Sequence, residues 1–281
     1  MAYCDLHTHS TASDGTLTPE QIIREAEKIG LSAVVLSDHN TVDGLAAFLA
    51  AGEGSCVEAV PAVEFSTQYG EKELHILGMF IRPEVYGQIA ALLELQLLNK
   101  EKSNIDLIQR LAGVGVVLDY GKIKAQAGSY VNRAVIGAEM VRLGYVASVP
   151  EAFDRYLDEK IGLYVPAPRL DSYEAIRFIK SIGAVAVLAH PLLGWDGKSL
   201  RGFLPKAVEA GLDGMEVYYS KYSPETTALA EKIAGEFQLL PSGGSDFHGD
   251  NKPGIYLGVG RGDLKIPDTW LDALRSRAKI I

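Results

Sequence analysis

The sequence has few of the features expected of an exported or membrane protein. It contains two cysteines, Cys4 and Cys56, in 281 residues, and a disulfide scaffold would need more. No stretch approaches the ~20 uninterrupted apolar residues of a membrane-spanning helix. The N-terminus begins with a predicted strand instead of a basic segment followed by an apolar one. These absences predict a cytoplasmic protein that does not enter a membrane.

Positive charge is also scarce. Lysine and arginine number 27 against 36 aspartates and glutamates, which gives a net charge of −9. A broad basic surface that neutralises the phosphates of a nucleic-acid duplex is therefore not expected. A small phosphorylated substrate is compatible with this balance, because divalent ions bound by some of the carboxylates would make their surroundings locally positive.

The sequence does have six histidines, and each lies in a short motif that carries an acidic residue or ends an apolar run. The motifs are DLHTHS with His7 and His9, LSDHNT with His39, ELHIL with His75, VLAHPL with His190 and GSDFHG with His248. A single histidine is most often a hydrogen-bonded core residue, but roughly six independent coincidences of this kind are improbable. We interpret the set as ligands of a metal site.

The first motif suits chelation because side chains alternate along a strand, so that His7 and His9 face the same way. The other motifs add the carboxylates of Asp14, Asp38, Glu64 and Asp246. This number of nitrogen and oxygen donors exceeds what one tetrahedral ion uses, so two or three divalent ions are expected. Mixed imidazole and carboxylate shells accept manganese, iron or zinc, and the sequence does not choose among them.

Short apolar runs alternate with helical patterns through much of the chain, which predicts an α/β fold with parallel strands and right-handed crossovers. The predicted strands are Tyr3–His7, Ala33–Ser37, Val57–Phe65, Leu74–Phe80, Ala184–Ala189, Gly214–Tyr218 and Leu239–Gly243. Helices are predicted to begin at Thr18, Asp171 and Ser223, the first with a capping box and a stop at Gly30.

Most of the histidine motifs follow directly on a predicted strand. The active site of an α/β barrel lies at the carboxyl ends of its strands, so these residues are expected to converge on one rim. His75 is the exception, because it opens its apolar run instead of following it.

The alternation breaks between residues 83 and 165, where helical patterns cover Tyr86–Leu98, Lys102–Leu111, Val135–Leu143 and Val149–Leu157. Two interpretations are open: a structural bundle that covers one face of the barrel, or a lid that shapes the substrate pocket. We divide the chain into a barrel of residues 1–82 and 166–281 and an inserted helical cap of residues 83–165.

The order of the motifs resembles the PHP family of metal-dependent phosphoesterases over almost the whole chain. The series runs HTHS, Asp14 with Gly15, SDHNT, Glu64, His75, AHP and SDFHG. The segment Gly144–Leu157, followed by Tyr164–Pro166, resembles the inserted helical region of stand-alone 3',5'-nucleoside bisphosphate phosphatases and 5'-3' exoribonucleases. The resemblance implies a distorted (β/α)7 barrel with an inserted, mainly helical cap, and it favours the lid interpretation.

The resemblance also implies how three ions are held. His7, His9, Glu64 and Asp246 would hold the first ion, Glu64, His75 and His190 the second, and Asp14, His39 and His248 the third. Glu64 would bridge two ions ~4 Å apart, so that a shared water becomes the hydroxide that attacks the phosphate. The proton for the leaving oxygen would come from Asp246 or His248, and both assignments are open.

Two further carboxylates lie near the same rim. Asp38 is interpreted as an outer residue that orients a ligand histidine or a metal-bound water, or alternatively as an N-cap or turn residue. Glu216, at the end of a predicted strand, is interpreted as a hydrogen-bonded structural carboxylate and not as a ligand.

The sequence offers one specific candidate for substrate binding. The related phosphatases begin a cap helix with an arginine followed two residues later by a histidine; here Arg133 is kept and Val135 replaces the histidine. We predict that Arg133 binds a phosphate in a bidentate manner.

The predicted function is hydrolysis of a phosphate monoester of a small molecule, a nucleotide such as a 3',5'-nucleoside bisphosphate or a nucleoside monophosphate. One alternative is a histidinol-phosphate-like phosphatase. Another is a 5'-3' exonuclease on short RNA or DNA, with Tyr120, Tyr130, Tyr145 and Phe153 as candidate stacking residues. A third is a non-enzymatic PHP module of the kind attached to bacterial replicative polymerases. No oligomeric state is predicted.

Overall fold

The structure is a computed structural model that describes residues 2–127 and 131–279 of the chain. The chain divides into two compact units, one of Met1–Ala90 and Leu170–Ile281 and the other of Ala91–Arg169. Tyr130, one of the candidate stacking residues, lies outside the described residues.

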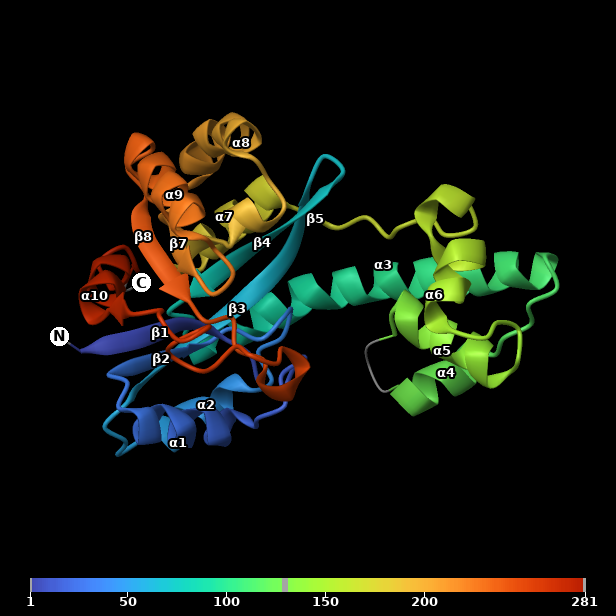
Figure 1. The fold of residues 1–281 in the computed structure, drawn as a ribbon, viewed down its shortest axis with the longest axis horizontal. Helices are drawn as coiled ribbons and strands as arrows, with labels where there is room; N and C mark the ends of the chain where they lie inside the picture. The colour runs from blue at the N-terminus through green and yellow to red at the C-terminus, as the bar shows by residue number, and fades with distance from the viewer. Residues whose placement is uncertain (1, 128–130, 280–281) are drawn as a thin grey trace. The chain divides into compact units, whose positions relative to one another are not determined.

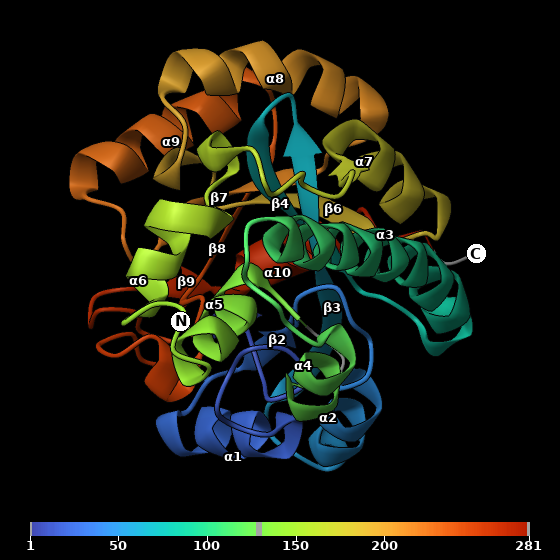
Figure 2. The same cartoon turned by 90° about the vertical axis from the view of Figure 1, so that its right-hand side faces the viewer.

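The first unit is built on one curved sheet with helices packed around its outside. Its strands are β1 (Tyr3–Thr8), β2 (Ala33–Leu36), β3 (Glu58–Tyr69), β4 (Lys72–Met79), β5 (Leu170–Asp171), β6 (Val185–Ala189), β7 (Gly214–Tyr219), β8 (Leu240–Gly244) and β9 (Ile266–Pro267). Its helices are α1 (Pro19–Ile29), α2 (Leu45–Gly52), α7 (Ser172–Ser181), α8 (Gly197–Ala210), α9 (Pro224–Glu236) and α10 (Asp268–Arg275). Helices α1 and α2 lie on one side of the sheet and α7, α8 and α9 on the opposite side (Figure 1, Figure 2).

The strand order is β8-β7-β6-β4-β3-β2-β1-β9, and β5 pairs with β3. Beyond β8, Phe247 forms a parallel bridge with Thr8 of β1, so the sheet curves into a nearly closed barrel. Seven of the described strands are longer than two residues, and each of the seven coincides with a predicted strand. The distorted barrel is therefore confirmed. The two-residue strands β5 and β9 were not predicted, because so short a segment leaves no periodic pattern.

The expectation of parallel strands throughout is wrong in one place. Strand β4 runs antiparallel to both of its neighbours, β3 and β6, while the pairs β1–β2, β2–β3, β6–β7 and β7–β8 are parallel. Only the two residues 70 and 71 separate β3 from β4. A hairpin of that length can join only antiparallel strands, since a parallel pair needs a crossover connection.

The helices of this unit begin where their capping residues predict. Thr18 and Gln21 form a reciprocal capping box at α1, and Gly30 ends the helix in the left-handed conformation with φ 75°. Asp171 caps α7 by accepting hydrogen bonds from two backbone N–H groups, and Ser223 caps α9. These caps satisfy N–H groups that the first turn of a helix leaves without partners.

A hydrophobic core fills the inside of the curved sheet. Leu6, Val35, Leu77 and Val187 come from four different strands and are completely buried. Cys4 is buried in the same core, and burial raises the pKa of its thiol. This packed core gives the residues at the carboxyl ends of the strands a rigid base.

The second unit is helical and has a core of its own. Helix α3 (Tyr86–Gly113) begins in the first unit and continues into the second, where α4 (Tyr120–Ala127), α5 (Arg133–Arg142), α6 (Val149–Ala152) and the π-turn Phe153–Leu157 follow. The patterns predicted at Tyr86–Leu98 and Lys102–Leu111 belong to this one continuous helix. Tyr120, Tyr145 and Phe153 pack against the core of the unit. In the described part of the chain, no helix combines the length and the apolarity that crossing a bilayer requires.

Candidate metal centre

The structure places the predicted ligands at one rim of the barrel. His7 lies in β1, Glu64 in β3 and His75 in β4, whereas His9, Asp14, His39, His190, Asp246 and His248 follow the ends of β1, β2, β6 and β8. These residues form four overlapping groups in which the potential ligand atoms lie within 4.8 Å of one another. All nine predicted ligands belong to at least one group.

The position of His75 follows from the direction of β4. Because β4 runs opposite to its neighbours, its beginning lies beside the ends of β3 and β6, and His75 pairs with Ala189, the last residue of β6. A histidine that opens an apolar run thus reaches the same rim as histidines that close one. The predicted exception is explained by the hairpin.

The end of β1 and the segment after β8 are joined directly. The backbone N–H of Asp246 donates to the carbonyl of His7 (2.9 Å), and the N–H of His9 donates to the carbonyl of Phe247 (2.9 Å). These bonds extend the pairing beyond β8. They bring the HTHS and SDFH motifs together although more than 230 residues separate them.

Glu64 lies at the centre of the cluster and is completely buried. Its Oε2 is 3.2 Å from Nε2 of both His7 and His9, and 3.1 Å from Nδ1 of His39. Its Oε1 is 2.9 Å from Nδ1 of His75 and 3.1 Å from Nε2 of His190. The two oxygens of one carboxylate therefore face two different sets of histidines.

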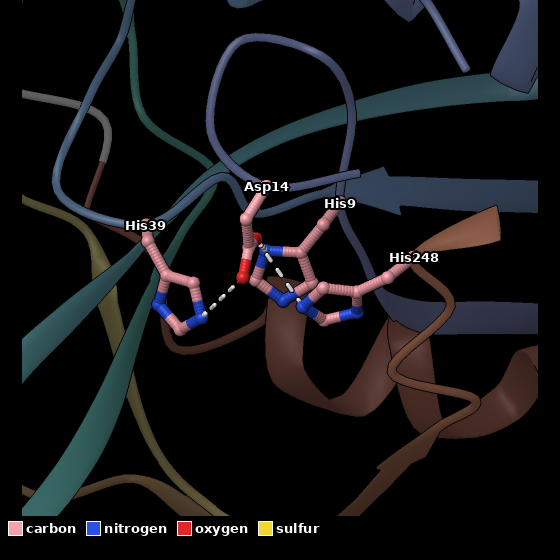
Figure 3. A group of neighbouring side chains, drawn as sticks. All are labelled: His9, Asp14, His39 and His248. Atoms are coloured by element: carbon pink, nitrogen blue, oxygen red, sulfur yellow. Dashed lines mark ion pairs between the residues drawn. The ribbon is translucent and has the colours of Figure 1, made fainter. Parts of the chain in front are cut away.

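A second group surrounds Asp14. Its Oδ1 is 3.7 Å from Nδ1 of His9 and 3.3 Å from Nε2 of His248, and its Oδ2 is 4.0 Å from Nε2 of His39 (Figure 3). The resemblance assigned Asp14, His39 and His248 to one ion, and the structure brings His9 to the same group. Unlike the buried Glu64, the Asp14 side chain is 55% exposed.

The donor atoms of this cluster fit divalent ions. The Nε2 atoms of His7 and His9 are only 3.0 Å apart, and both face Oδ1 of Asp246, at 3.6 and 3.3 Å. Among the described residues, the buried Nδ1 of His9 and Nε2 of His248 have no hydrogen-bond partner. Buried nitrogen atoms that converge without partners are costly unless a ligand satisfies them, and an ion with nitrogen and carboxylate ligands does so.

The carboxyl group at the centre of the cluster is held in its ionised form. Burial alone would raise the pKa of the Glu64 carboxyl, but the neighbouring rings of His39, His7 and His75 hold it well below its usual range. Burial lowers the pKa of His39 to about 4, against the attraction of Glu64. An ionised carboxylate and a neutral imidazole are the forms that bind a cation, whereas Glu64 raises the pKa of His75 to about 10 against the effect of burial, so a cation bound there has to displace a proton.

Three residues at this rim have a strained backbone. Asn40, His190 and Asp246 adopt positive φ angles of 50°, 32° and 55°. Such conformations are uncommon for residues other than glycine and persist where the surrounding contacts fix them. Two of the three are predicted ligands, and the third follows His39.

Asp38 is buried and binds the loop that carries Asp14. Its Oδ1 accepts hydrogen bonds from the backbone N–H of Ser10 (2.7 Å) and the hydroxyl of Ser13 (2.6 Å), and its Oδ2 accepts from the hydroxyl of Ser10 (2.6 Å). These partners correspond to the turn interpretation of Asp38, since none of them is a histidine. The backbone carbonyl of Asp38 also accepts a hydrogen bond from the N–H of the ligand Glu64 at 3.2 Å.

Three residues that the sequence did not single out as metal-site partners contact ligands directly. Glu216 contacts His7 and His190. Tyr219 and Lys252 both donate to Oδ2 of Asp246, at 2.8 and 2.6 Å. The strand-end position of Glu216 was a usable signal, but Tyr219 and Lys252 carried none, because isolated tyrosines and lysines are common on strands and loops.

Arg133 lies at the start of α5 in the second unit. Its guanidinium donates to the carbonyl of Leu157 (3.1 Å), is 3.3 Å from Glu159 and stacks on the ring of Tyr164 at 4.3 Å. Val135 packs against the core of the same unit. The guanidinium of Arg133 would therefore bind a phosphate in addition to, or in exchange for, these partners.

Comparison with known proteins agrees with the geometry. The sequence profile of the PHP domain matches residues 5–141. A 5'-3' exoribonuclease of Haemophilus influenzae is 33% identical over 87% of this chain and 89% of its own length. A 3',5'-nucleoside bisphosphate phosphatase of Chromobacterium violaceum is 28% identical over 92% of this chain and 91% of its own. The crystal structure of a candidate metal-dependent phosphoesterase from Bifidobacterium adolescentis superposes with a TM-score of 0.76 at 25% identity, over 100% of this chain and 98% of that one.

Proposed function

Because the chain belongs to the PHP family of metal-dependent phosphoesterases, we propose that it hydrolyses the phosphate monoester of a small nucleotide, such as a 3',5'-nucleoside bisphosphate or a nucleoside monophosphate. The Chromobacterium relative named for the bisphosphate supports this substrate class. The net charge of −9 also favours a small phosphorylated substrate over a duplex.

The observation that carries the proposal is the central position of Glu64 between two sets of histidines. His7, His9 and Asp246 would hold one ion with Glu64, and His75 and His190 would hold another. When bound, divalent ions at these residues would lower the pKa of a water molecule and neutralise the non-bridging oxygens of the phosphate. Asp14, His39 and His248 would hold a third ion, and the donor set suits manganese, iron or zinc.

The exposure of the ligands indicates from which side the phosphate enters. His7, His9 and Glu64 are completely buried, whereas the side chains of His39 and His75 are 23% and 20% exposed. The phosphate would approach over these two rings and past Asp14, whose side chain is 55% exposed. The buried residues would then hold their ions away from bulk water. Electrostatic contacts are stronger in such a buried site than in bulk water.

Asp246 is the weaker of the two residues predicted to protonate the leaving oxygen. Its Oδ2 already accepts hydrogen bonds from Tyr219 and Lys252, and its Oδ1 faces His7 and His9. Burial opposes ionisation, but His9 and His7 hold the pKa of the Asp246 carboxyl well below its usual range. We therefore assign proton delivery to His248; in that role its Nε2 would carry a proton, and the third ion would be held by Asp14 and His39 without it.

Lys252 adds a positive charge beside this carboxylate. Its side chain is 29% exposed, and an ammonium group has three N–H donors, of which Asp246 uses one. Tyr219 already holds the same oxygen from the buried side. We assign to Lys252 a second role, a contact with an oxygen of the substrate phosphate.

A 5'-3' exonuclease acting on short RNA or DNA is the second candidate, favoured by the Haemophilus relative of that name. Such an enzyme needs basic and stacking residues beyond the phosphate that it cleaves. Tyr120, Tyr145 and Phe153 pack against the core of the second unit, which leaves less of each ring for a base. This contact favours the nucleotide over the oligonucleotide.

A phosphate-release screen with manganese tests the proposal. The substrates would be nucleoside monophosphates, 3',5'-bisphosphates, histidinol phosphate, sugar phosphates and short oligonucleotides with a 5'-phosphate, and Glu64→Ala would be the control for a contaminating phosphatase. We expect the highest kcat/KM for a nucleotide. Faster release of mononucleotides from oligonucleotides than of phosphate from any nucleotide would establish the exonuclease instead, and a preference for histidinol phosphate would overturn both.

A further inference from the structure

Glu216 links two of the ligand histidines. This residue lies in β7 and is completely buried. Its Oε1 is 2.8 Å from Nδ1 of His7, and its Oε2 accepts a hydrogen bond from the backbone N–H of His190 at 2.6 Å. His7 comes from β1 and His190 follows β6, so one side chain connects both flanks of the strand pair β7 and β8.

On the side of His7, Glu216 holds one of the two ring nitrogens. A carboxylate accepts hydrogen bonds, so Nδ1 of His7 donates to Glu216, and Nε2 is the nitrogen left for an ion. That Nε2 faces Glu64 at 3.2 Å and Nε2 of His9 at 3.0 Å. The contact with Glu216 thus leaves His7 in the tautomer that a metal ion requires.

On the side of His190, Glu216 stabilises an unfavourable backbone conformation. His190 has φ 32° and ψ 46°, in the left-handed region that residues other than glycine seldom adopt. Its N–H points to Glu216 in this conformation, and its Nε2 is 3.1 Å from Oε1 of Glu64. Without this acceptor the N–H would lose the hydrogen bond that stabilises the conformation, and the imidazole would move with the backbone.

Glu64 and Glu216 therefore hold the same two histidines at different atoms. Glu64 faces Nε2 of both rings, one with each oxygen, while Glu216 binds the ring of His7 at Nδ1 and the backbone of His190. We propose that Glu216 is a positioning residue that couples the two ion positions shared through Glu64, so that its removal weakens both together. This inference rests on the proposed metal site but not on the identity of the substrate.

An irregularity of β7 explains how two of its residues contact metal ligands although the strand supplies no ligand itself. The pairing of β7 with β8 shifts register between Glu216 and Tyr218. In a regular strand, residues three positions apart point to opposite faces, but a bulge changes that alternation. Both Glu216 and Tyr219 consequently contact ligands, at His7 and at Asp246.

The experiment compares the wild type with Glu216→Gln and Asp213→Asn. A glutamine can accept from only one of the two N–H groups, and its NH2 group turned toward His7 would favour the wrong tautomer. Asp213 is the matched control, because it also binds a backbone N–H of the β6 strand, that of Ala186 at 2.9 Å, and it contacts Lys180 and no ligand. Manganese binding would be measured by chelator competition, and bound metal by elemental analysis.

We expect Glu216→Gln to bind manganese about 10–100-fold more weakly, the usual effect of losing such an outer partner, with more than one equivalent lost together. Asp213→Asn should bind manganese like the wild type. Wild-type affinity in Glu216→Gln, or the loss of a single equivalent, would overturn the coupling. A glutamine variant that fails to fold would be replaced by Glu216→Asp, which keeps the charge but is too short to reach both histidines.

Nitrogen NMR of the zinc-loaded protein provides a second readout, because an ion on Nε2 of His7 replaces any proton shared there with Glu64, 3.2 Å away. The wild type should show the Nδ1–H of His7 bound to Glu216, and Glu216→Gln should weaken or lose that signal, which a merely structural role for Glu216 would not produce. Retention of the wild-type signal in the variant would contradict the proposal. Because neither measurement uses an ester, the positioning role can fail while hydrolysis stands, and the reverse also holds.

Discussion

Tyr219 and Lys252 donate to the same oxygen, Oδ2 of Asp246, from opposite environments. The hydroxyl of Tyr219 is 2.8 Å away and belongs to a side chain that is only 4% exposed, whereas the ammonium of Lys252 is 2.6 Å away on a side chain that is 29% exposed. The buried donor can only position Asp246, whereas the exposed donor is the one to which we assign a contact with the substrate. Substitution of both donors, one at a time, therefore distinguishes the positioning of Asp246 from a contact with the substrate.

We expect Lys252→Met to lower kcat/KM roughly 10–100-fold, since a lost charge-assisted hydrogen bond is worth about 1.5–3 kcal/mol. Its metal content should stay at the wild-type level, because Tyr219 still holds Asp246. Tyr219→Phe should show the converse, with reduced metal retention during dialysis. Identical behaviour of the two variants in metal analysis and kinetics would mean that Lys252 only positions Asp246.

Glu64→Ala should remove bound metal and activity together, because both oxygens of Glu64 face histidines of different groups. His7→Ala should do the same. Elemental analysis of the metal-replete wild type should give two to three ions per chain, and both variants should give fewer. A wild type with less than one ion per chain would refute the multinuclear centre.

Asp38→Ala should loosen the loop that carries Asp14. The substitution leaves one backbone N–H and two hydroxyls without their acceptor. We expect the free energy of unfolding of the metal-free protein, measured with urea, to fall by about 2–3 kcal/mol. Ser13→Ala removes only one of these hydrogen bonds and should cost about 1 kcal/mol. Equal losses in the two variants would show that Asp38 does not hold the loop.

Arg133→Ala should weaken substrate binding or turnover by about 1–3 kcal/mol if the guanidinium binds a phosphate, with metal content unchanged. Val135→His should then shift the preference toward nucleoside bisphosphates. The control is Glu159→Ala, which removes the carboxylate near Arg133 and keeps the guanidinium. A lower free energy of unfolding in Arg133→Ala, without a kinetic effect on any substrate, would assign Arg133 to the structure of the second unit alone.

The sequence predicted the family, the distorted barrel and the class of hydrolase, and these predictions are confirmed. The reason is physical: a histidine or carboxylate after a buried strand has a defined place once the strands form a barrel. The sequence pattern does not show in which direction a strand runs. The position of His75 at the rim therefore became clear only from the antiparallel pairing of β4 with β3 and β6. Glu216 was predicted as a hydrogen-bonded carboxylate near the rim but not as a partner of ligands, and Tyr219 was not predicted, because their common orientation depends on a bulge that the alternation of a regular strand does not predict.

The reversed direction of β4 also decides how the inserted segment can be altered. Met79, at the end of β4, pairs with Val185, the first residue of β6, and so lies at the end of the barrel opposite to the ligands. The chain returns at Leu170, which pairs with Thr67, beyond Glu64 on the ligand side. A tight turn cannot close that gap, because Met79 pairs with Ala62 and Leu170 with Thr67, five residues further along β3, which is roughly 16–17 Å at about 3.3 Å per residue. Any shortened version of the protein would need a linker of at least that reach, and grafting of foreign segments at this position has to respect the same spacing.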